Sequence, residues 1–208
     1  MQSVDRRQPP AHDRARLIYL HGFRSSPQSF KAQVMTRRMT ELGRGADFVC
    51  PQLPASPAAA VALVLDQIRP QRQDTLGASS LGGYYATWLA ERCGCRAVLL
   101  NPAIHAARDL ATQVGTHAMY HDSEQAFVFE PRYVDELAAL DAGALREPQR
   151  YLLVAATGDE VLDWREMVAR YPGARHIVID GSDHGLSDFE SLVDEVLRFA
   201  GILSQGNH

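Results

Sequence analysis

Short apolar runs, each closed by glycine, proline or polar residues, recur along this chain. A continuous apolar run of this kind is typical of a strand that is buried on both faces of a parallel sheet. From these runs, and from the segment that leads into the sharpest turn of the chain, we predict six strands. They are Leu17–Leu20, Phe48–Cys50, Thr75–Ser79, Ala97–Leu100, Tyr151–Ala155 and His176–Ile179.

Segments with the spacing of amphipathic helices separate the strands. We expect helices over residues 27–42, 57–69, 81–92, 163–170 and 186–200. Strands that alternate with helices form βαβ units, so the pattern predicts an α/β protein. Its architecture would be a three-layer α/β/α sandwich around a mostly parallel six-stranded sheet. Such sheets bind ligands beyond the carboxyl ends of their strands, where the functional site is expected.

Two segments fall outside this rhythm. Residues 1–15 are polar and contain proline, so we expect a flexible N-terminal arm before a single domain over residues 16–203. Residues 103–150 are longer than one crossover helix requires. Because long insertions are often functional, we interpret this insertion as a partly helical lid over the site. The alternative is a pair of crossover helices that never touch substrate.

Composition narrows the function classes. The formal net charge of −4 argues against nucleic acid or an anionic membrane as the main partner, because both attract positive charge. The start of the chain lacks the apolar region of a secretory signal, and no apolar stretch is long enough to span a bilayer. Cys50, Cys93 and Cys95 form no paired framework, which favours a reducing compartment. A cytoplasmic location is therefore expected.

The segment Ala78–Gly82 fits the pattern of a nucleophile elbow, in which a serine sits on a tight turn between a strand and a helix. The residues two before and two after the nucleophile must be small, and this condition selects Ser80. Ser79 is the competing nucleophile, but its own neighbours at these positions are Gly77 and Leu81, and the leucine would clash. The alternative is a serine and glycine turn without chemistry.

A serine needs a base, and the base needs an acid that orients it. In the nucleophile-elbow fold the chain order is serine, then acid, then histidine. Asp159 follows the strand at residues 151–155, and His184 follows the last strand. We therefore assign Ser80 as nucleophile, Asp159 as acid and His184 as base. Glu160 or Asp163 could serve as the acid instead.

An oxyanion hole needs two backbone N–H groups. We assign them to Leu81, which follows the nucleophile, and to Phe23, which lies in the loop after the first strand. In the same loop His21 is expected to brace the backbone through hydrogen bonds. Arg24 could contact an anionic part of a substrate, although a solvated side chain is the preferred reading.

Cofactor sites find little support in the sequence. His117 and His121 have the spacing to share a metal ion, but no glutamate follows His117, so two surface histidines are the preferred interpretation. The glycine-rich stretch 77–83 lacks the lysine of a P-loop, which argues against nucleotide binding. We expect no metal and no cofactor.

The chain closely resembles the YqiA-type family of small bacterial esterases over roughly residues 17–200. The matching segments are Ile18–Phe23, Ser25–Pro27, Cys50–Pro54, Ser79–Trp88, Asn101–Ala103, Thr157–Asp163 and the His184 loop. Ala78 in the elbow and the Gly185-Leu186 pair depart from the family pattern. The resemblance implies a minimal α/β-hydrolase fold and a hydrolase of small-molecule carboxylic esters or thioesters without cofactor. It also carries the roles of nucleophile, acid and base onto Ser80, Asp159 and His184.

The sequence therefore predicts a serine esterase that works through an acyl-enzyme. An acyl-CoA thioesterase with the same triad is one alternative. A non-catalytic binding protein that kept the fold is another, since fold alone does not prove function. The physiological substrate, the acyl chain length and the oligomeric state stay open.

Overall fold

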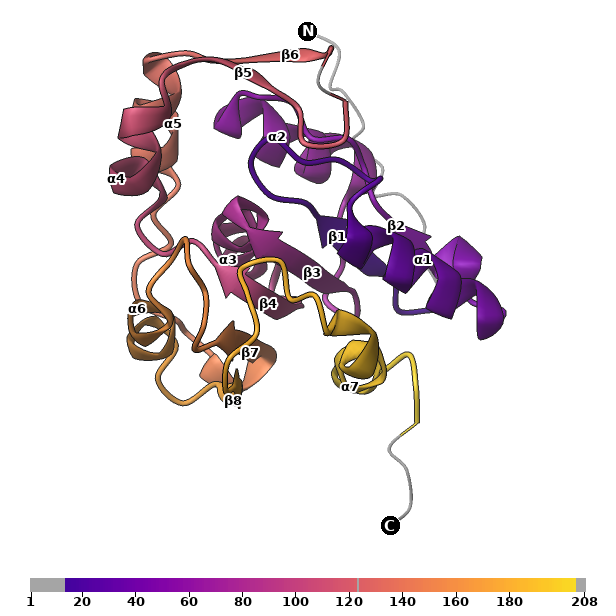
Figure 1. Ribbon diagram of the computed structural model, residues 1–208. Coiled ribbons are helices and arrows are strands. Elements are labelled where there is room, and N and C mark those ends of the chain that lie inside the picture. Colours follow the sequence, from indigo (N-terminus) through magenta and orange to yellow (C-terminus); the bar gives the residue numbers. More distant parts are fainter. Residues whose placement is uncertain (1–13, 123, 205–208) are drawn as a thin grey trace, which may run out of the picture.

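The computed structural model describes residues 14–122 and 124–204 of the chain (Figure 1). Residues 1–13 of the expected N-terminal arm lie outside the described residues. The helices are α1 (Phe30–Glu41), α2 (Pro57–Leu63), α3 (Leu81–Cys93), α4 (Ala106–Leu110), α5 (Arg132–Ala139), α6 (Trp164–Arg170) and α7 (Val193–Phe199). In this part of the chain, no helix has the length and apolarity that a membrane crossing requires.

Six strands form the main sheet. They are β1 (Leu17–Leu20), β2 (Phe48–Val49), β3 (Thr75–Ser80), β4 (Arg96–Pro102), β7 (Tyr151–Ala156) and β8 (Arg175–Ile179). Their order is β2-β1-β3-β4-β7-β8, and each neighbouring pair is parallel. The predicted α/β class and six-stranded sheet are confirmed. The strand order reverses between β1 and β3, and this switch point is where such sheets form their ligand crevice.

Helices cover both faces of the sheet. Along β1, Leu17 and Tyr19 pack into one core together with residues of α1 and α7. Ile18 and Leu20 point to the opposite face and pack with residues of α2, α3 and α6. Figure 1 shows α1 and α7 close together on one side of the sheet. Because both faces of the central strands are buried, these strands read as continuous apolar runs in the sequence.

The last helix begins later than the sequence indicated. We expected a helix over residues 186–200, but α7 starts at Val193 and follows a short 3-10 turn, Phe189–Ser191. Leu186 has a positive φ of 50°, which breaks the helix before it can form. Its backbone N–H bonds to the carbonyl of Asp183, whose carboxylate accepts the N–H of Ser187 at 2.8 Å. Residues 183–187 are therefore a loop that presents His184.

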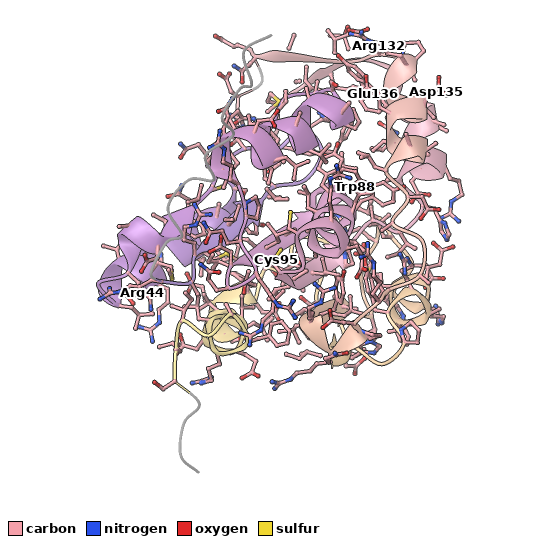
Figure 2. All side chains as sticks on the ribbon, turned by 180° about the vertical axis from the view of Figure 1, so that it is seen from behind. Arg44, Trp88, Cys95, Arg132, Asp135 and Glu136 are labelled. Atoms are coloured by element: carbon pink, nitrogen blue, oxygen red, sulfur yellow. The ribbon has the colours of Figure 1, made fainter. Side chains whose placement is uncertain are left out.

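The insertion at residues 103–150 contains α4, α5 and a hairpin that the sequence did not indicate. Its strands, β5 (Gly115–Ala118) and β6 (Ala126–Phe129), are antiparallel and form a separate two-stranded sheet. Helix α5 is docked through Glu136, whose carboxylate accepts the hydroxyl of Ser56 at 2.6 Å and the N–H of Ala58 at 3.0 Å. Figure 2 shows Glu136 with Arg132 and Asp135 along this helix. The carboxylate thus caps the N-terminus of α2 and holds the insertion against the main body.

Candidate active site

The turn between β3 and α3 holds Ser80 in a strained conformation. Its backbone angles are φ 53° and ψ −124°, a region that non-glycine residues seldom adopt. The β3–β4 ladder shifts register between Ser79 and Ser80, and the carbonyl of Ser80 accepts the N–H of Ala103 at 3.0 Å. Ser79 remains in the ladder before this shift. The strained turn therefore belongs to Ser80, as the elbow pattern requires of a nucleophile.

Close packing explains the glycines of the elbow. A Cβ at position 82 would lie 2.1 Å from the carbonyl oxygen of Leu20, and one at position 83 would lie 2.5 Å from the Cβ of Pro102. The loop after β1 also passes close, because a Cβ on Gly22 would lie 3.1 Å from the Cβ of Ser80. Side chains are excluded from positions 82 and 83, so the turn can press against β1 and β4.

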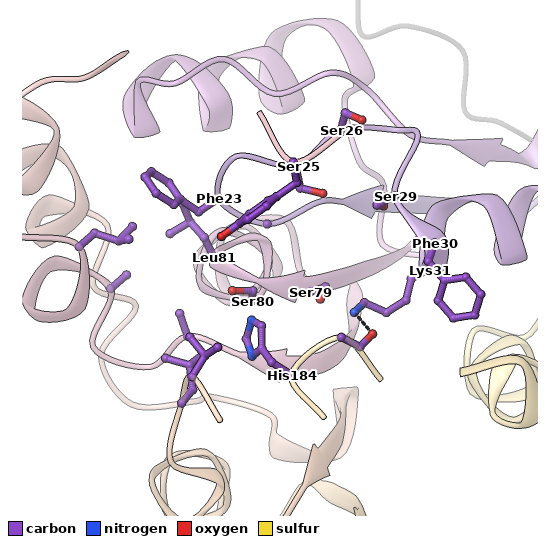
Figure 3. A pocket seen from close by; sticks show the side chains of 18 of the residues that line it. Phe23, Ser25, Ser26, Ser29, Phe30, Lys31, Ser79, Ser80, Leu81 and His184 are labelled. Atoms are coloured by element: carbon purple, nitrogen blue, oxygen red, sulfur yellow. Dashed lines mark hydrogen bonds between the residues drawn. The ribbon is translucent and has the colours of Figure 1, made fainter. Parts of the chain in front are cut away.

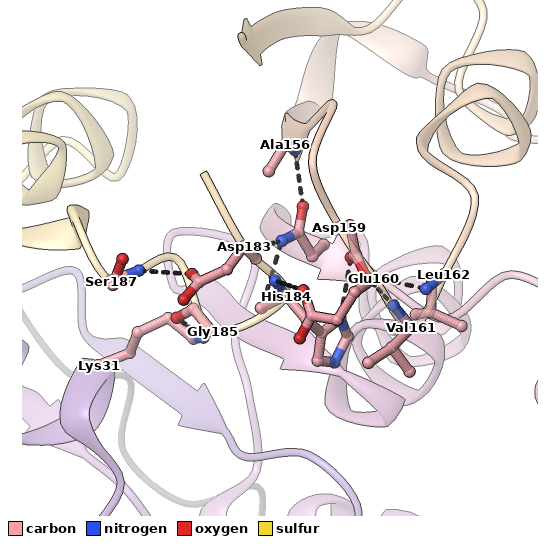
Figure 4. A network of polar contacts seen from close by, with 11 residues as sticks. Lys31, Ala156, Asp159, Glu160, Val161, Leu162, Asp183, His184, Gly185 and Ser187 are labelled. Carbon is pink, nitrogen blue, oxygen red and sulfur yellow. Dashed lines mark hydrogen bonds and ion pairs between the residues drawn. The ribbon is translucent and has the colours of Figure 1, made fainter. Parts of the chain in front are cut away.

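His184 and Asp159 form a buried pair (Figure 4). The ring nitrogen Nδ1 of His184 lies 2.8 Å from Oδ2 and 3.0 Å from Oδ1 of Asp159. The carboxylate of Asp159 is fully buried, and its Oδ1 also accepts the N–H groups of Val161 and Leu162, each at 2.8 Å. These backbone bonds fix the carboxylate in place, and the carboxylate fixes the ring.

The two alternative acids, Glu160 and Asp163, bond to backbone N–H groups. Glu160 accepts the backbone N–H of His184 at 2.9 Å, so it holds the loop rather than the ring. Asp163 caps α6 by accepting the N–H of Arg165 at 2.9 Å. Among these three carboxylates, only that of Asp159 bonds the imidazole.

Ser80 and His184 line the same cavity, and in Figure 3 the imidazole lies beside the Ser80 side chain. Within the described residues no hydrogen bond joins the two side chains. Nδ1 is occupied by Asp159, which leaves Nε2 as the nitrogen that can meet the serine hydroxyl. The structure thus brings together the three side chains that the sequence selected.

Asn101 is a positioning residue that the sequence analysis named only within a segment matching the family motifs. It is fully buried, and its Nδ2 donates to the carbonyls of Asp183 at 3.0 Å and His184 at 3.2 Å. Its Oδ1 accepts the N–H of Ala156 at 2.8 Å. One side chain therefore connects the carboxyl ends of β4 and β7 with the His184 loop. An asparagine directly before Pro102, at the end of a central strand, was the available signal.

The two assigned oxyanion donors lie beside the elbow. Leu81 is the first residue of α3, so its N–H has no partner within the helix. The N–H of Phe23 makes no backbone hydrogen bond among the described residues. His21 braces this loop, because its Nε2 accepts the N–H of Leu53 at 3.0 Å while Nδ1 faces the carbonyl of Gly22 at 3.1 Å. Burial lowers the pKa of His21, which favours the neutral ring that this pattern needs.

Three further residues named in the sequence analysis, Arg24, His117 and His121, lie in the insertion or contact it. Arg24 is part-buried and contacts the insertion: its Nε donates to the carbonyl of Ala118 at 2.7 Å, and its guanidinium lies 4.4 Å from the ring centre of Tyr120. His117 is bonded to the carbonyl of Gln113 at 2.6 Å, and His121 lines the cavity. No group of three or more metal-ligating side chains occurs in the described ranges.

The cavity has a volume of about 830 Å³ and two chemically different ends. Beyond Ser80 on the β4 and β7 side, its wall is mainly apolar and is formed by Leu81, Ala103, Ala106, Leu110 and Leu162, with Asp109 and Gln113 as polar members. On the β1 side, its wall is polar and is formed by Tyr19, Ser26, Ser29, Lys31 and Ser79. Figure 3 shows Ser29, Ser79 and Lys31 together on one side of Ser80. Ser80 therefore lies between an apolar end and a polar end of the cavity.

Lys31 is a second residue that the sequence analysis missed. It is only 8% exposed, and its Nζ donates to the carbonyl of Gly185 at 2.5 Å. Burial lowers its pKa from 10.5 to about 8, while Asp183 and Asp159 oppose that shift. Lysine and arginine together number 21 in this chain, and Lys31 is the only lysine among them. That composition was the signal that could have singled it out.

Solved structures with the same fold come from several bacteria. A putative hydrolase from Agrobacterium vitis is 17% identical, with a TM-score of 0.64, and the match covers 93% of this chain and 91% of that one. Ferulic acid-bound Est1E from Butyrivibrio proteoclasticus is 14% identical, with a TM-score of 0.65 and coverage of 89% and 87%. Carboxylesterase CesB from Bacillus subtilis is 17% identical, with a TM-score of 0.54 and coverage of 91% and 84%.

These similarities establish the α/β-hydrolase fold that the sequence predicted. A match of the whole domain establishes the family. Residues 16–201 match the family described as Uncharacterised protein family (UPF0227). The chain belongs to this family, the YqiA-type family that its motifs resemble.

Proposed function

We propose that this protein is a serine esterase that cleaves carboxylic esters through an acyl-enzyme. The observation that carries the proposal is the Asp159–His184 pair, whose ring lines the same cavity as a serine held on a strained elbow. The hydrolase and esterase folds among the structural neighbours are consistent with it.

In the first half of the reaction, His184 takes the proton of the Ser80 hydroxyl as its oxygen attacks the ester carbonyl. The N–H groups of Phe23 and Leu81 would bind the oxyanion that develops. The carbon–oxygen bond to the alcohol then breaks, and the imidazolium returns its proton to the leaving alcohol. In the second half, His184 takes a proton from water as its oxygen attacks the acyl carbon. The bond between the acyl carbon and the Ser80 oxygen then breaks, the imidazolium returns its proton to Ser80, and the carboxylic acid leaves.

Asp159 holds the ring in the required tautomer. Its carboxylate accepts a hydrogen bond from the Nδ1–H group, so Nε2 carries the lone pair that faces the serine. Two backbone N–H groups on Oδ1 stabilise the ionised carboxylate and keep it from rotating. The acid therefore also stabilises the imidazolium that forms during each proton transfer.

We further propose that the insertion at residues 103–150 acts as the lid of the single domain over residues 16–203. Tyr120 and His121, which follow β5, line the cavity. The backbone N–H of Tyr120 bonds to the carbonyl of Arg24 at 3.0 Å, so the tip of the insertion is tied to the loop that carries Phe23. Movement of the hairpin would change the oxyanion loop and the cavity mouth together.

Substitution of the two neighbouring serines tests the nucleophile. Ser80→Ala is expected to lower kcat for p-nitrophenyl butyrate by about 10⁴–10⁶-fold and to abolish labelling by a fluorophosphonate probe. Ser79→Ala is expected to keep the label, which peptide mass spectrometry would locate on Ser80. Wild-type turnover by Ser80→Ala, or a label on Ser79, would refute the assignment.

A further inference from the structure

The side chain of Lys31 is a buried cation that faces the cavity without an ion-pair partner. Across the part of the chain that the structure describes, no carboxylate lies within salt-bridge distance of its Nζ. The carboxylate of Asp183 acts on it at longer range and is itself bonded to the N–H of Ser187 (Figure 4). The carbonyl of Gly185 occupies one of the three N–H groups of the ammonium. The other two have no partner among the described residues.

Hydroxyl groups line the same polar end of the cavity as this ammonium. Tyr19 and Ser79 are almost fully buried, at 1% and 6% exposure, and both line the cavity. The hydroxyl of Ser29 is buried and has no hydrogen-bond partner. Ser29 also precedes the first residue of α1 without capping it, so the free N–H groups of that helix begin at the same place. The polar end thus offers hydrogen-bond donors and one positive charge.

Such an arrangement is unfavourable unless an acceptor fills it. A buried ammonium without a counter-ion loses its hydration, and the buried Ser29 hydroxyl, which makes no hydrogen bond, loses its hydrogen bonds to water. A bound anion restores both interactions at once. Hydrocarbon, by contrast, would fit the opposite end, which Leu81, Leu110 and Leu162 line. The two ends therefore favour different parts of one substrate.

We propose that the polar end, formed by Tyr19, Ser29, Lys31 and Ser79, binds a carboxylate or phosphate group on the alcohol part of the ester. The proposal rests on the proposed esterase function and specifies its substrate class: esters of an uncharged acyl chain with an anionic alcohol. The acyl chain lies in the apolar end, the scissile carbonyl at Ser80, and the anion on Lys31.

A purely structural role for Lys31 would give a different outcome. Its bond to the carbonyl of Gly185 holds the residue after His184, so loss of that bond would disturb the ring whatever the substrate. Anion binding instead distinguishes charged from neutral substrates. The decisive quantity is therefore the ratio of kcat/KM for a charged ester to that for its neutral isostere.

Carboxymethyl butyrate and carbamoylmethyl butyrate form such a pair, and release of butyrate measures both reactions at pH 7. The wild-type enzyme is expected to favour the charged ester by about 10–100-fold, the usual strength of one charge-assisted hydrogen bond. Lys31→Met should remove this preference, mainly by raising KM for the charged ester. Equal losses for the two esters, or no preference in the wild type, would overturn the proposal.

A binding measurement separates this proposal from the esterase proposal. Because Lys31 is the only lysine, protein grown with ¹³C-lysine gives one side-chain signal whose pH titration reports the ammonium directly. N-butyrylglycine carries the anion on an amide that resists hydrolysis, and N-butyrylglycinamide is its neutral control. We expect only the charged amide to raise the pKa of Lys31.

The corresponding N-butyryl aminomethylphosphonate shows whether the end prefers a phosphate-like group. A shift with the charged amides but no ester turnover would refute the esterase and keep the anion site. Ester turnover with no shift from either anion would refute the anion site alone.

Discussion

Replacement of Asp159 by asparagine tests the geometry of the buried His184 pair. The carboxylate accepts three hydrogen bonds: the Nδ1 proton of His184 and the N–H groups of Val161 and Leu162. An asparagine in the same place must keep its carbonyl oxygen on the two backbone donors. Its amide nitrogen then faces Nδ1 and donates to it, which forces the ring proton onto Nε2.

The wrong tautomer removes the base, because Nε2 no longer has a lone pair for the Ser80 proton. We expect kcat for p-nitrophenyl butyrate to fall by about 10⁴-fold, the size of this effect in the trypsin-like triad. Such a fall corresponds to about 5.5 kcal/mol of lost transition-state stabilisation. KM should change little, since Asp159 is fully buried and does not line the cavity.

Two neighbouring carboxylates supply matched controls. Glu160→Gln keeps an oxygen that can accept the backbone N–H of His184, and Asp163→Asn keeps an oxygen that can cap α6. Both should retain kcat within about tenfold. Thermal unfolding confirms that each variant is folded. If Asp159→Asn also stays within tenfold of the wild type, or if Glu160→Gln shows the larger loss, the assignment of the acid is wrong.

Three further substitutions, the first with a matched control, probe the packing and charge around the site. Gly82→Ala places a Cβ against the carbonyl of Leu20 and should lower the free energy of unfolding, measured by urea titration, by about 3 kcal/mol. Gly45→Ala is the control: its Cβ would lie 3.4 Å from the hydroxyl oxygen of Thr40, so the free energy of unfolding should hardly change. Asn101→Leu leaves the N–H of Ala156 unpaired and frees the His184 loop, so kcat should fall by about 10–100-fold with KM kept; equal activity would refute its positioning role. Lys31→Met should raise the free energy of unfolding at pH 7. Burial lowers the pKa of Lys31 from 10.5 to about 8, so the buried charge costs about 3 kcal/mol. Loss of the hydrogen bond to Gly185 offsets part of this gain. This penalty is complete below pH 8 and disappears as the pH rises through 10.5, so the variant's advantage in urea should vanish by then.

Most of the sheet could be predicted from the sequence because its central strands are buried on both faces. Each apolar run, such as Leu17–Leu20 or Tyr151–Ala156, marks one strand regardless of what surrounds it. The hairpin β5–β6 could not be found in this way. Its strands have four residues each, they are partly exposed, and no short glycine or asparagine turn joins them.

Chain order selected the three candidate side chains, but it could not locate the residues that support them. Ser80 ends β3, and Asp159 and His184 each follow a strand, so parallel topology alone brings them to one edge of the sheet. Asn101 bonds the His184 loop only because residues 183–187 are a loop, where the sequence had predicted a helix start. A position that depends on how two loops meet carries no local pattern, and its role emerges only from the fold.

The composition of the chain and the position of Lys31 both support the proposed anion site. Arginine is never deprotonated in proteins, and its planar group is larger than an ammonium. Among the described residues, every exposed cation of this kind is an arginine and the buried Arg16 is paired with Asp74, whereas the one lysine is buried against the cavity without an ion pair. A chain selected for stability alone would place an apolar residue at position 31, because the unpaired charge is unfavourable there. A negative group on the substrate therefore explains why a charge lies beside Ser80. A Lys31→Met enzyme that is more stable, and that no longer distinguishes charged from neutral esters, would separate the requirement for stability from the requirement for anion binding.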